Sequence, residues 1–535
     1  MRNLRKRIRG ALRRKRQDIF LSSALYVLIS ALVALKGPFV VTLFRLRLPA
    51  LSPHSPALPL TLILVFCLLL PKYVNMKRVL LLFGIAALAH LLFFKPGSLT
   101  DDQPHGKTPA TEIETSVNRN LLIISIGNLR PDRMSGYGAV RNTSMHIDRL
   151  AAGSLMFTSA YTNVPSAAAA HATLFTGLHA AAHGVSDAPF APLKDGAERR
   201  TAPTLAELMR RGGWRTEAVI ERGALPPAFN LDQGFDRYDT TAPDLPAAVA
   251  LAVRRLEENR GEKLFMFFHT ASLAPPFNPP APYHTAYSPG YKGKLGYVVG
   301  LDDFLPINSG NLEPTPADEE HILALYDAEL LYADVQLGRL LRHLRSSGLM
   351  ERSVIVLLSD HGETLGEHGA YGDARRSLHE EALRIPLIIS IPGVRRRSVD
   401  LRVSLVDVMP SLLDLFGIPP GGEFWGESIF ALLSKTTGEK TGRAVFAETE
   451  RGQKKAIIAG RYKFIMETRP ETPAPRFNTA QNLFYFIGGR ELYDLRSDPR
   501  ERNNLVRTDS PRARAMEKLL NKTSAKARGG GPQHN

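Results

Sequence analysis

Apolar runs of strand length alternate with helical patterns along this chain of 535 residues, and this alternation limits the folds that it can adopt. The apolar runs lie at 120–128, around Val219, and at 263–269, 353–360 and 385–393. Helical patterns lie between them at 202–211, 243–258 and 319–346. Strands that are apolar throughout and separated by helices are typical of a parallel sheet covered on both faces. The sequence therefore predicts an α/β domain with a largely parallel central sheet.

The pattern changes after Pro419 and Pro420. Shorter strand patterns follow at 444–448, 456–460 and 462–466, and a turn-rich segment lies at 491–505. We expect an α/β domain over 119–418 and a smaller C-terminal α+β subdomain over 419–507. The polar tail at 508–535 contains glycines near its end and is predicted to be disordered.

The N-terminal segment, 1–95, combines a basic arm with apolar segments. Residues 1–17 contain no acid, and the apolar segments lie at 19–35, 58–70 and 79–94. Each is near or just under the length of a helix that crosses a bilayer. The positive-inside rule places the arm in the cytoplasm, so three transmembrane helices would put the rest of the chain outside. The short second segment leaves a two-span arrangement open.

These features predict an integral protein of the cell inner or plasma membrane whose soluble domain is extracytoplasmic. A polar segment at 96–118 with Pro and Gly is expected to link the membrane part to that domain. The membrane itself is the first expected partner.

The charge distribution argues against nucleic acid as a partner. The net charge is +16, but fifteen Lys and Arg against one acid, Asp18, lie before residue 95. The rest of the chain is almost neutral, whereas nucleic-acid binding requires a basic surface on a folded domain. The one cysteine, Cys67, lies in the second apolar segment, which excludes an intrachain disulfide and a cysteine-ligated zinc site.

Several polar residues follow the predicted strands directly. Ligands of open α/β sheets bind at the carboxyl ends of the strands. The residues at those ends are Gly127, Asn128, His269, Asp360 and His361. The sequence therefore predicts that a functional site forms from this set.

Eight segments of the chain, in order, resemble the sulfatase family of the alkaline phosphatase superfamily over about 120–505. They include "NLLIISIGNLRPDRMSGYG", "HATLFTGLHAAAHGV", "VLLSDHGETLGEHG", "EEALRIPLIISIPG" and "ELYDLRSDPRERNNL". The resemblance implies an alkaline-phosphatase-like fold and the hydrolysis of sulfuric esters. Such chemistry needs a divalent metal, a nucleophile and a general acid.

The resemblance assigns metal ligands to the ends of two strands. The carboxylates of the first strand end are replaced here by Gly127 and Asn128, whereas Asp360 and His361 match the second. Asp360, His361 and Asn128 are therefore the candidate ligands of one divalent cation, Ca²⁺ or Mg²⁺. We expect this ion to be weakly bound or absent, because the charge of the ligands sets the affinity. A structural role for Asp360 and His361 as a strand-end cap is the alternative.

The nucleophile position of the family falls on Ala167, counted back from Gly177. A methyl group cannot attack an ester, and it cannot be oxidised to formylglycine. Ser166 is one residue away and could serve if the loop were shifted, or it could be a helix N-cap. His171 is a further candidate nucleophile.

The remaining catalytic positions are also altered. The histidine that would contact the ester falls on Ala274, while His269 matches an earlier histidine of the family and is either a catalyst or a buried strand-end residue. Arg375 could bind an anion or belong to a solvated basic loop. The lysine of the family falls near Glu221, whose charge has the wrong sign for binding sulfate.

Two functions follow from these replacements. The first is a membrane-anchored, catalytically degenerate member of the family, a pseudosulfatase, with a binding or scaffolding role toward an envelope protein or an anionic glycan. The alternative is an active sulfuric- or phosphoric-ester hydrolase or transferase with an altered metal site.

Overall fold

The structure is a computed structural model that describes residues 119–187, 190–194, 203–435, 443–468 and 489–528. The predicted basic arm, the apolar segments and the linker lie outside these residues. Within the described part of the chain, no helix is both long and apolar enough to cross a bilayer.

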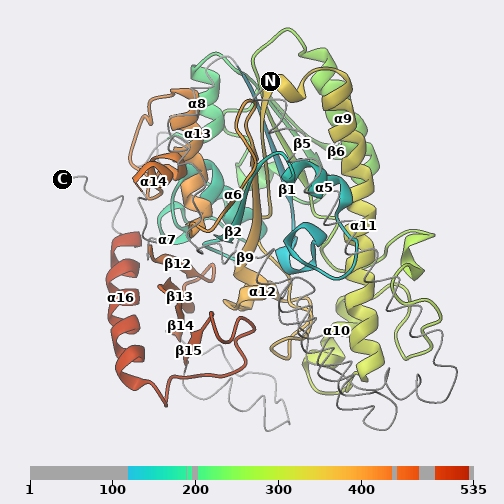
Figure 1. Cartoon of the computed structure of the whole chain (residues 1–535), viewed down its shortest axis with the longest axis vertical. Helices are drawn as coiled ribbons and strands as arrows, with labels where there is room; N and C mark the ends of the chain where they lie inside the picture. The colour runs from blue at the N-terminus through green and yellow to red at the C-terminus, as the bar shows by residue number, and fades with distance from the viewer. Residues whose placement is uncertain (1–118, 188–189, 195–202, 436–442, 469–488, 529–535) are drawn as a thin grey trace, which may run out of the picture. The chain divides into compact units, whose positions relative to one another are not determined.

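A nine-stranded sheet forms the centre of the molecule (Figure 1). Its strands, in spatial order, are β10 (Arg397–Val399), β2 (Leu155–Tyr161), β9 (Arg384–Ser390), β8 (Ser353–Leu358), β1 (Asn120–Ile126), β7 (Leu264–Thr270), β5 (Arg215–Glu221) and β6 (Arg237–Ala242), and β11 (Val403–Ser404) pairs with β2. Neighbouring strands are parallel except at β9, which is antiparallel to both β2 and β8. The prediction of a largely parallel sheet is confirmed.

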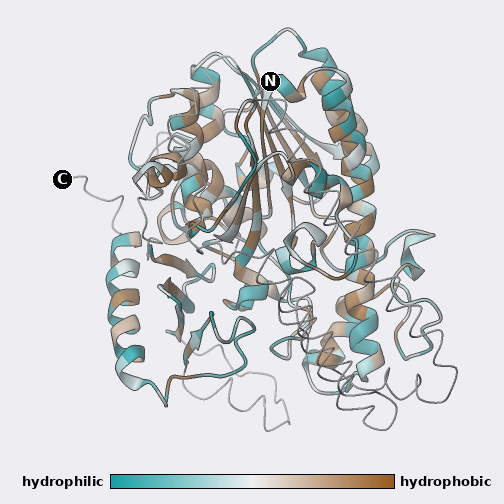
Figure 2. Cartoon of the chain, in the orientation of Figure 1, coloured by the Kyte–Doolittle hydropathy of each residue, from teal (hydrophilic) through white to brown (hydrophobic). Residues whose placement is uncertain are grey.

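Helices cover both faces of this sheet. One face carries α5 (Met145–Ala151), α9 (Leu245–Glu258), α10 (Leu301–Asn308) and α11 (Pro316–Ser346). The other carries α6 (Ala167–Thr176), α8 (Leu205–Arg211), α13 (Val408–Phe416) and α14 (Ile429–Lys435). Leu121 and Ile123 of β1 pack into the second layer, and Leu122 and Ile124 into the first, because successive side chains of a strand point to opposite faces. Both faces of the central strands are therefore apolar, and these strands are largely brown in Figure 2, the colour of hydrophobic residues.

The predicted helices at 202–211, 243–258 and 319–346 correspond to α8, α9 and α11. Each of these three helices begins directly after an N-cap residue. The side chains of Thr204, Asp244 and Thr315 each accept a backbone N–H of the first turn. In α11, Pro316 occupies the first position, where its missing N–H costs nothing.

A smaller antiparallel sheet follows the main domain. Its order is β12 (Val445–Glu448), β13 (Lys454–Ala459), β14 (Tyr462–Glu467) and β15 (Arg490–Asp494). Ile429 and Phe430 of α14, which follow the predicted boundary at 418, pack into the core of the main domain. Two short helices, α7 (Ala180–His183) and α12 (Glu380–Leu383), and a short hairpin of β3 (Ser186–Asp187) and β4 (Phe190–Ala191) complete the α-helices and strands of the described residues.

The prediction of disorder over 508–535 is wrong for most of that tail, because Ser510–Arg528 form the helix α16. Its side chains at Ala513, Met516 and Leu520 are buried against Phe464 and other residues of the small sheet. Their spacing of three and four residues forms one narrow apolar stripe on an otherwise charged helix. The high polarity of the segment concealed this stripe.

Candidate functional site

Three neighbouring strands, β8, β1 and β7, end at the same edge of the main sheet and bring together the predicted strand-end residues. Asn128 follows β1 in a left-handed conformation (φ 61°) that asparagine tolerates. Its backbone N–H donates to Oδ1 of Asp360, at 3.2 Å, and so ties the end of β1 to the end of β8.

Asp360 is almost completely buried, and its two oxygens have different environments. Oδ1 also accepts the backbone N–H of His361, at 2.7 Å. Oδ2 has no hydrogen-bond partner among the described residues. Burial raises the pKa of Asp360, but electrostatic interaction with His361, His171 and His269, in the protonated form that the rings take at low pH, outweighs it and brings the pKa to about 2. Asp360 is therefore an ionised carboxylate with one unengaged oxygen.

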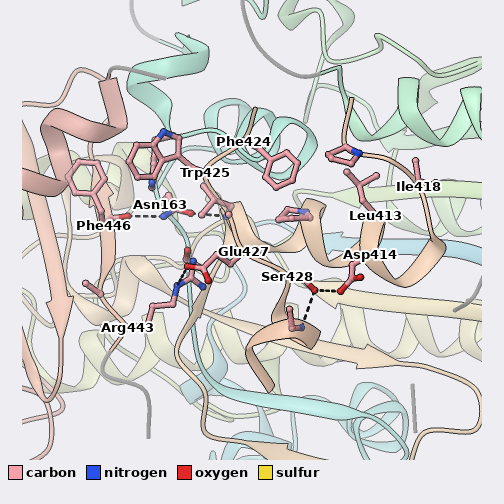
Figure 3. A pocket seen from close by; sticks show the side chains of 18 of the residues that line it. Asn163, Leu413, Asp414, Ile418, Phe424, Trp425, Glu427, Ser428, Arg443 and Phe446 are labelled. Atoms are coloured by element: carbon pink, nitrogen blue, oxygen red, sulfur yellow. Dashed lines mark hydrogen bonds and ion pairs between the residues drawn. The ribbon is translucent and has the colours of Figure 1, made fainter. Parts of the chain in front are cut away.

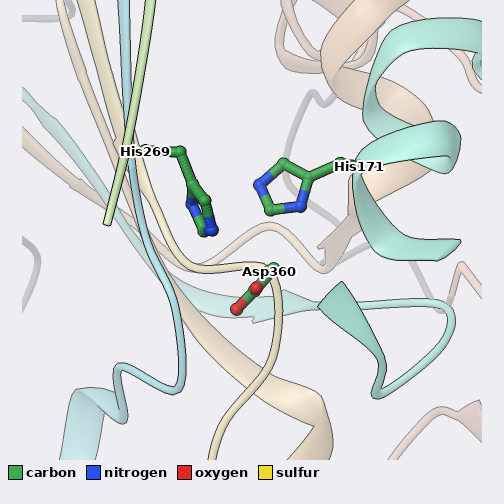
Figure 4. Close-up of side chains that lie close together, drawn as sticks. All are labelled: His171, His269 and Asp360. Carbon is green, nitrogen blue, oxygen red and sulfur yellow. The ribbon is translucent and has the colours of Figure 1, made fainter. Parts of the chain in front are cut away.

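His171 and His269 lie beside this carboxylate (Figure 4). His171 comes from α6 and His269 from β7, and the ring centroids are 4.4 Å apart. Burial lowers the pKa of both rings, in the case of His269 to about 3, so both are neutral. One possible ligand atom from each of His171, His269 and Asp360 lies within 4.8 Å of the others. We call these three residues the His–His–Asp cluster.

Hydrogen bonds to the backbone fix which nitrogen of each ring carries the proton. Nδ1 of His171 lies 2.6 Å from the carbonyl oxygen of Ala167, and Nδ1 of His269 lies 3.2 Å from that of Ser125. A carbonyl oxygen only accepts, so both Nδ1 atoms are protonated and both Nε2 atoms offer a lone pair. Nε2 of His171 accepts from the Ser125 hydroxyl at 2.8 Å, whereas Nε2 of His269 has no partner among the described residues.

The predicted nucleophile position lies at the start of α6. Ala167 is the first residue of that helix, and Ser166 precedes it in extended conformation without capping it. The Ser166 hydroxyl instead contacts the carboxylates of Asp187, at 2.9 Å, and Glu450. Burial and the charge of Glu450 raise the pKa of Asp187. The hydroxyl of Ser166, which precedes the nucleophile position, therefore lies between two acidic side chains.

The other candidates take separate positions. Nδ1 of His361 lies 2.7 Å from the carbonyl oxygen of Gly362, which fits the strand-end structural role. Ala274 lies in the loop after β7, where its N–H donates to Ala271. Arg375 is exposed on a single 3-10 turn, within electrostatic reach of Asp187.

The sequence did not indicate that Glu363 is a hydrogen-bond partner of Asn128 at the strand ends. Its Oε2 accepts from Nδ2 of Asn128 at 2.9 Å, and its Oε1 accepts from the backbone of Thr364 at 2.8 Å. Burial raises the pKa of Glu363 to about 7. The closeness of Glu363 to Asp360 in the segment "SDHGE" was the signal that could have indicated it.

The donor atoms do not match a calcium or magnesium site. Such ions prefer six or more oxygen ligands, most of them charged. Here Asp360 supplies one free carboxylate oxygen, and both oxygens of Glu363 already accept hydrogen bonds. A side chain at position 127 would be directed toward the site, since a Cβ there would lie 3.5 Å from Oδ2 of Asp360, but Gly127 has none. The expected hard-cation site is therefore not assembled by these residues.

A cavity of about 980 Å³ lies apart from the His–His–Asp cluster (Figure 3). Aromatic side chains of Phe424, Trp425 and Phe446 line it, together with the Arg443 guanidinium. Arg443 makes two hydrogen bonds of 2.6 Å to Asp407, so its charge is already compensated. This cavity includes none of the three cluster residues, each of which is at most 1% exposed.

The comparisons with known proteins agree with the resemblance. The family model for sulfatases matches residues 119–418, and that for the C-terminal part of N-sulphoglucosamine sulphohydrolase matches 366–471. The chain is 25% identical to the uncharacterized sulfatase YidJ of Escherichia coli over 434 residues, which are 72% of this chain and 83% of that protein. Arylsulfatase K of Danio rerio is 31% identical over 31% of this chain and 38% of its own length.

Solved structures show the same fold. The phosphonate monoester hydrolase of Agrobacterium radiobacter superposes with a TM-score of 0.60 at 21% identity, over 76% of this chain and 96% of that chain. The protein BT4656, solved with D-glucosamine-2-N,6-O-disulfate, gives a TM-score of 0.61 at 18% identity, over 77% and 98%. With the match of the family model to more than half of the sequence, the chain belongs to the sulfatase family of the alkaline phosphatase superfamily.

Proposed function

We propose that this member of the sulfatase family is a pseudosulfatase, a protein that binds a ligand or partner and does not hydrolyse a sulfuric ester. The observation that carries the proposal is the start of α6, where Ala167 occupies the family's nucleophile position. The adjacent hydroxyl of Ser166 contacts Asp187 and Glu450. A sulfate or phosphate ester is anionic, so two carboxylates beside the Ser166 hydroxyl oppose its approach.

Burial of the His–His–Asp cluster supports the same proposal. His171, His269 and Asp360 are each at most 1% exposed, so a substrate has no direct access to them. A general acid must lie within hydrogen-bond reach of the leaving group. The family position for that acid is Ala274, which has no proton to donate.

For the binding role we propose an extracytoplasmic protein that is anchored by apolar segments near its N-terminus. The partner classes are an envelope protein and an anionic glycan. The glycan is supported by relatives whose names state glycan substrates, such as N-acetylglucosamine-6-O-sulfatase of Bacteroides thetaiotaomicron, which is 32% identical over 34% of this chain. A family scaffold that has lost its nucleophile can keep the surfaces that bind the rest of such a ligand.

A second candidate is an active hydrolase or transferase with an altered metal site. The His–His–Asp cluster favours it, because this group of residues could hold a metal ion. A metal can activate a bound water in place of a protein nucleophile. This candidate requires an opening of the buried cluster toward solvent.

The test is an ester assay on the full-length protein purified in detergent. Aryl sulfate, phosphate monoester and phosphonate monoester substrates are assayed in separate preparations loaded with calcium, magnesium, zinc or manganese. We expect no turnover above that of a denatured sample. Turnover of any ester that disappears in Asp360→Asn but survives in His284→Ala, which alters a histidine outside the cluster, would overturn the proposal.

The binding role is tested with the same preparation. Wild-type protein is titrated with sulfated oligosaccharides and with their desulfated forms, and binding is followed calorimetrically. Saturable binding of the sulfated form alone supports the glycan as the partner. A pull-down from solubilised membranes that returns one stoichiometric protein supports the envelope protein.

A further inference from the structure

We infer that the His–His–Asp cluster binds one divalent transition-metal ion of the zinc class, in place of the hard cation of the family. The inference goes beyond the proposed function, because it names an ion that the three cluster residues would hold, and it does not depend on whether the chain turns over an ester. It concerns the side chains of His171, His269 and Asp360.

Two buried atoms of the cluster lack partners. Oδ2 of Asp360 and Nε2 of His269 make no hydrogen bond to any residue that the structure describes. Buried polar atoms are nearly always paired, so two such atoms in one cluster indicate a missing partner. Both have a lone pair, since a carboxylate oxygen is an acceptor and His269 donates from Nδ1 to the carbonyl oxygen of Ser125. A cation satisfies both atoms at once.

The histidines are oriented as metal-binding histidines usually are. A ligating histidine commonly donates its second ring N–H to a carbonyl or carboxylate, which fixes the tautomer and the ring plane. Here both Nδ1 atoms donate to backbone carbonyls, those of Ala167 and Ser125. The partner of His171 lies four residues earlier on the same helix, so α6 itself fixes this ring. Nε2 of His269 is then left without a partner among the described residues, and Nε2 of His171 contacts the Ser125 hydroxyl.

The donor set selects the class of metal. Two imidazole nitrogens and one carboxylate oxygen suit zinc and its first-row neighbours, whereas calcium and magnesium require more oxygen ligands. The Ser125 hydroxyl, which lies 2.8 Å from Nε2 of His171, must turn away to free that nitrogen. Zinc sites with three protein ligands leave a fourth coordination position for a further ligand.

Charge gives an independent argument. Asp360 is a buried carboxylate whose Oδ2 makes no hydrogen bond to any described residue, and uncompensated buried charges are costly. No lysine or arginine forms an ion pair with Asp360 among the described residues, although such pairs occur elsewhere in the structure, as between Arg133 and Asp327. A dication would supply the compensating charge.

A second histidine group in the described residues is arranged differently. His368, His379 and Glu381 also lie close together, but the two rings stack in parallel with centroids 3.8 Å apart. Parallel stacked rings cannot both direct a lone pair in their planes at one ion. Every ring nitrogen of this pair already has a hydrogen-bond partner. The inference therefore applies to the His–His–Asp cluster alone.

The experiment measures metal in the full-length protein. The chain is purified in detergent without chelator, dialysed against a mixture of zinc, manganese, calcium and magnesium, and analysed for elements. We expect about one zinc per chain in wild type, and at least a fivefold lower content in His269→Gln and His171→Gln. His284→Ala, which changes a histidine outside the cluster, should keep the wild-type content.

A second measurement needs no variant. Wild-type protein reconstituted with Co²⁺ should show the visible absorption bands of nitrogen-coordinated cobalt, and zinc but not calcium should remove them. Zinc content in wild type that is no higher than in His269→Gln, together with no cobalt bands, overturns the inference. The same preparations enter the ester assay, which separates the two proposals. Turnover overturns the pseudosulfatase, whereas absence of metal overturns only this inference.

Discussion

The Ser166 hydroxyl lies 2.9 Å from Oδ2 of Asp187, and the Glu450 carboxylate contacts the same hydroxyl from the small sheet side of the molecule. One hydroxyl has a single proton to donate, so it cannot satisfy both carboxylates. The two acids therefore share a site in which full ionisation of both is unfavourable, and burial together with Glu450 raises the pKa of Asp187.

The first prediction concerns this acidic pair. Asp187→Asn should stabilise the protein at pH 8 and raise the Tm by about 1 to 2 °C, because it removes one of two like charges. A carboxyl whose pKa is raised in the folded state destabilises that state once it ionises. The gain should therefore shrink as the pH falls and wild-type Asp187 is protonated. Thermal unfolding at pH 8 and pH 5 measures it. A lower Tm at pH 8 would show that the bond to Ser166 outweighs the repulsion.

The second prediction concerns His368, whose Nδ1 lies 2.8 Å from Glu381. Burial lowers the pKa of His368, but the hydrogen bond and charge of Glu381 outweigh it and raise the pKa to about 9. A histidine with a raised pKa stabilises the folded state fully below its unfolded pKa of about 6.5, and this stability is lost as the pH rises through about 9. His368→Gln should therefore destabilise the protein by about 3 kcal/mol at pH 7, the range for breaking a buried pair.

The measurement for His368 is denaturant unfolding of both proteins at pH 7 and pH 10. The difference between them should become much smaller at pH 10, where the wild-type ring is neutral. His284→Gln, at a histidine outside this pair, serves as the control and should show no such pH dependence. A penalty that is equal at both pH values would mean that His368 contributes packing alone.

The third prediction concerns α16, the helix that sequence polarity concealed. Leu520 is fully buried between this helix and the small sheet. Leu520→Ala should cost about 2 to 4 kcal/mol, as is usual for a buried leucine. Lys522→Ala, at an exposed position of the same helix, should change stability by less than about 0.5 kcal/mol. The resistance of the two variants to limited proteolysis compares their stabilities. Equal resistance of the two variants would contradict the packing of α16.

The sequence predicted the strands of the main sheet well because they are apolar throughout. β1 and β8 lie within the predicted runs and β7 extends one residue beyond its run, and their ends bring His269 and Asp360 to one edge, as the parallel arrangement predicts. The sequence named His171 as a candidate nucleophile but did not indicate that its ring lies beside His269 and Asp360. It comes from α6, and only the packing of that helix on the sheet sets which of its residues faces the strand ends.

The surroundings of Ser166 were beyond sequence reasoning for a similar reason. Glu450 is 284 residues away along the chain and follows β12 of the small sheet. The small sheet and α6 are far apart in the sequence. Their relative position depends on tertiary packing, which the local sequence pattern of neither segment indicates. The narrow apolar stripe of α16 was missed because polarity was averaged over the tail instead of being read along one helix face.

The last prediction restores the ligands that the family positions at Gly127 and Asn128. The double variant Gly127→Asp, Asn128→Asp places two carboxylates beside Asp360, and it should bind Ca²⁺ with a Kd of about 10⁻⁴ to 10⁻³ M, the range of weak oxygen-ligand sites. Aspartate tolerates the left-handed conformation of residue 128, which has φ 61°. A Cβ at residue 127 would lie 3.3 Å from the carbonyl oxygen of Thr270, so a small shift of that loop is required.

Calorimetric titration with Ca²⁺ measures this gain against two controls, wild type and the neutral variant Gly127→Asn, which carries the same steric change without charge. We expect no heat of binding in either control. If wild type bound Ca²⁺ as tightly as the double variant, the oxygen donors already present would suffice for a hard cation. If only the double variant binds Ca²⁺, the two added carboxylates are what the wild-type site lacks as a calcium site, because every other residue is unchanged.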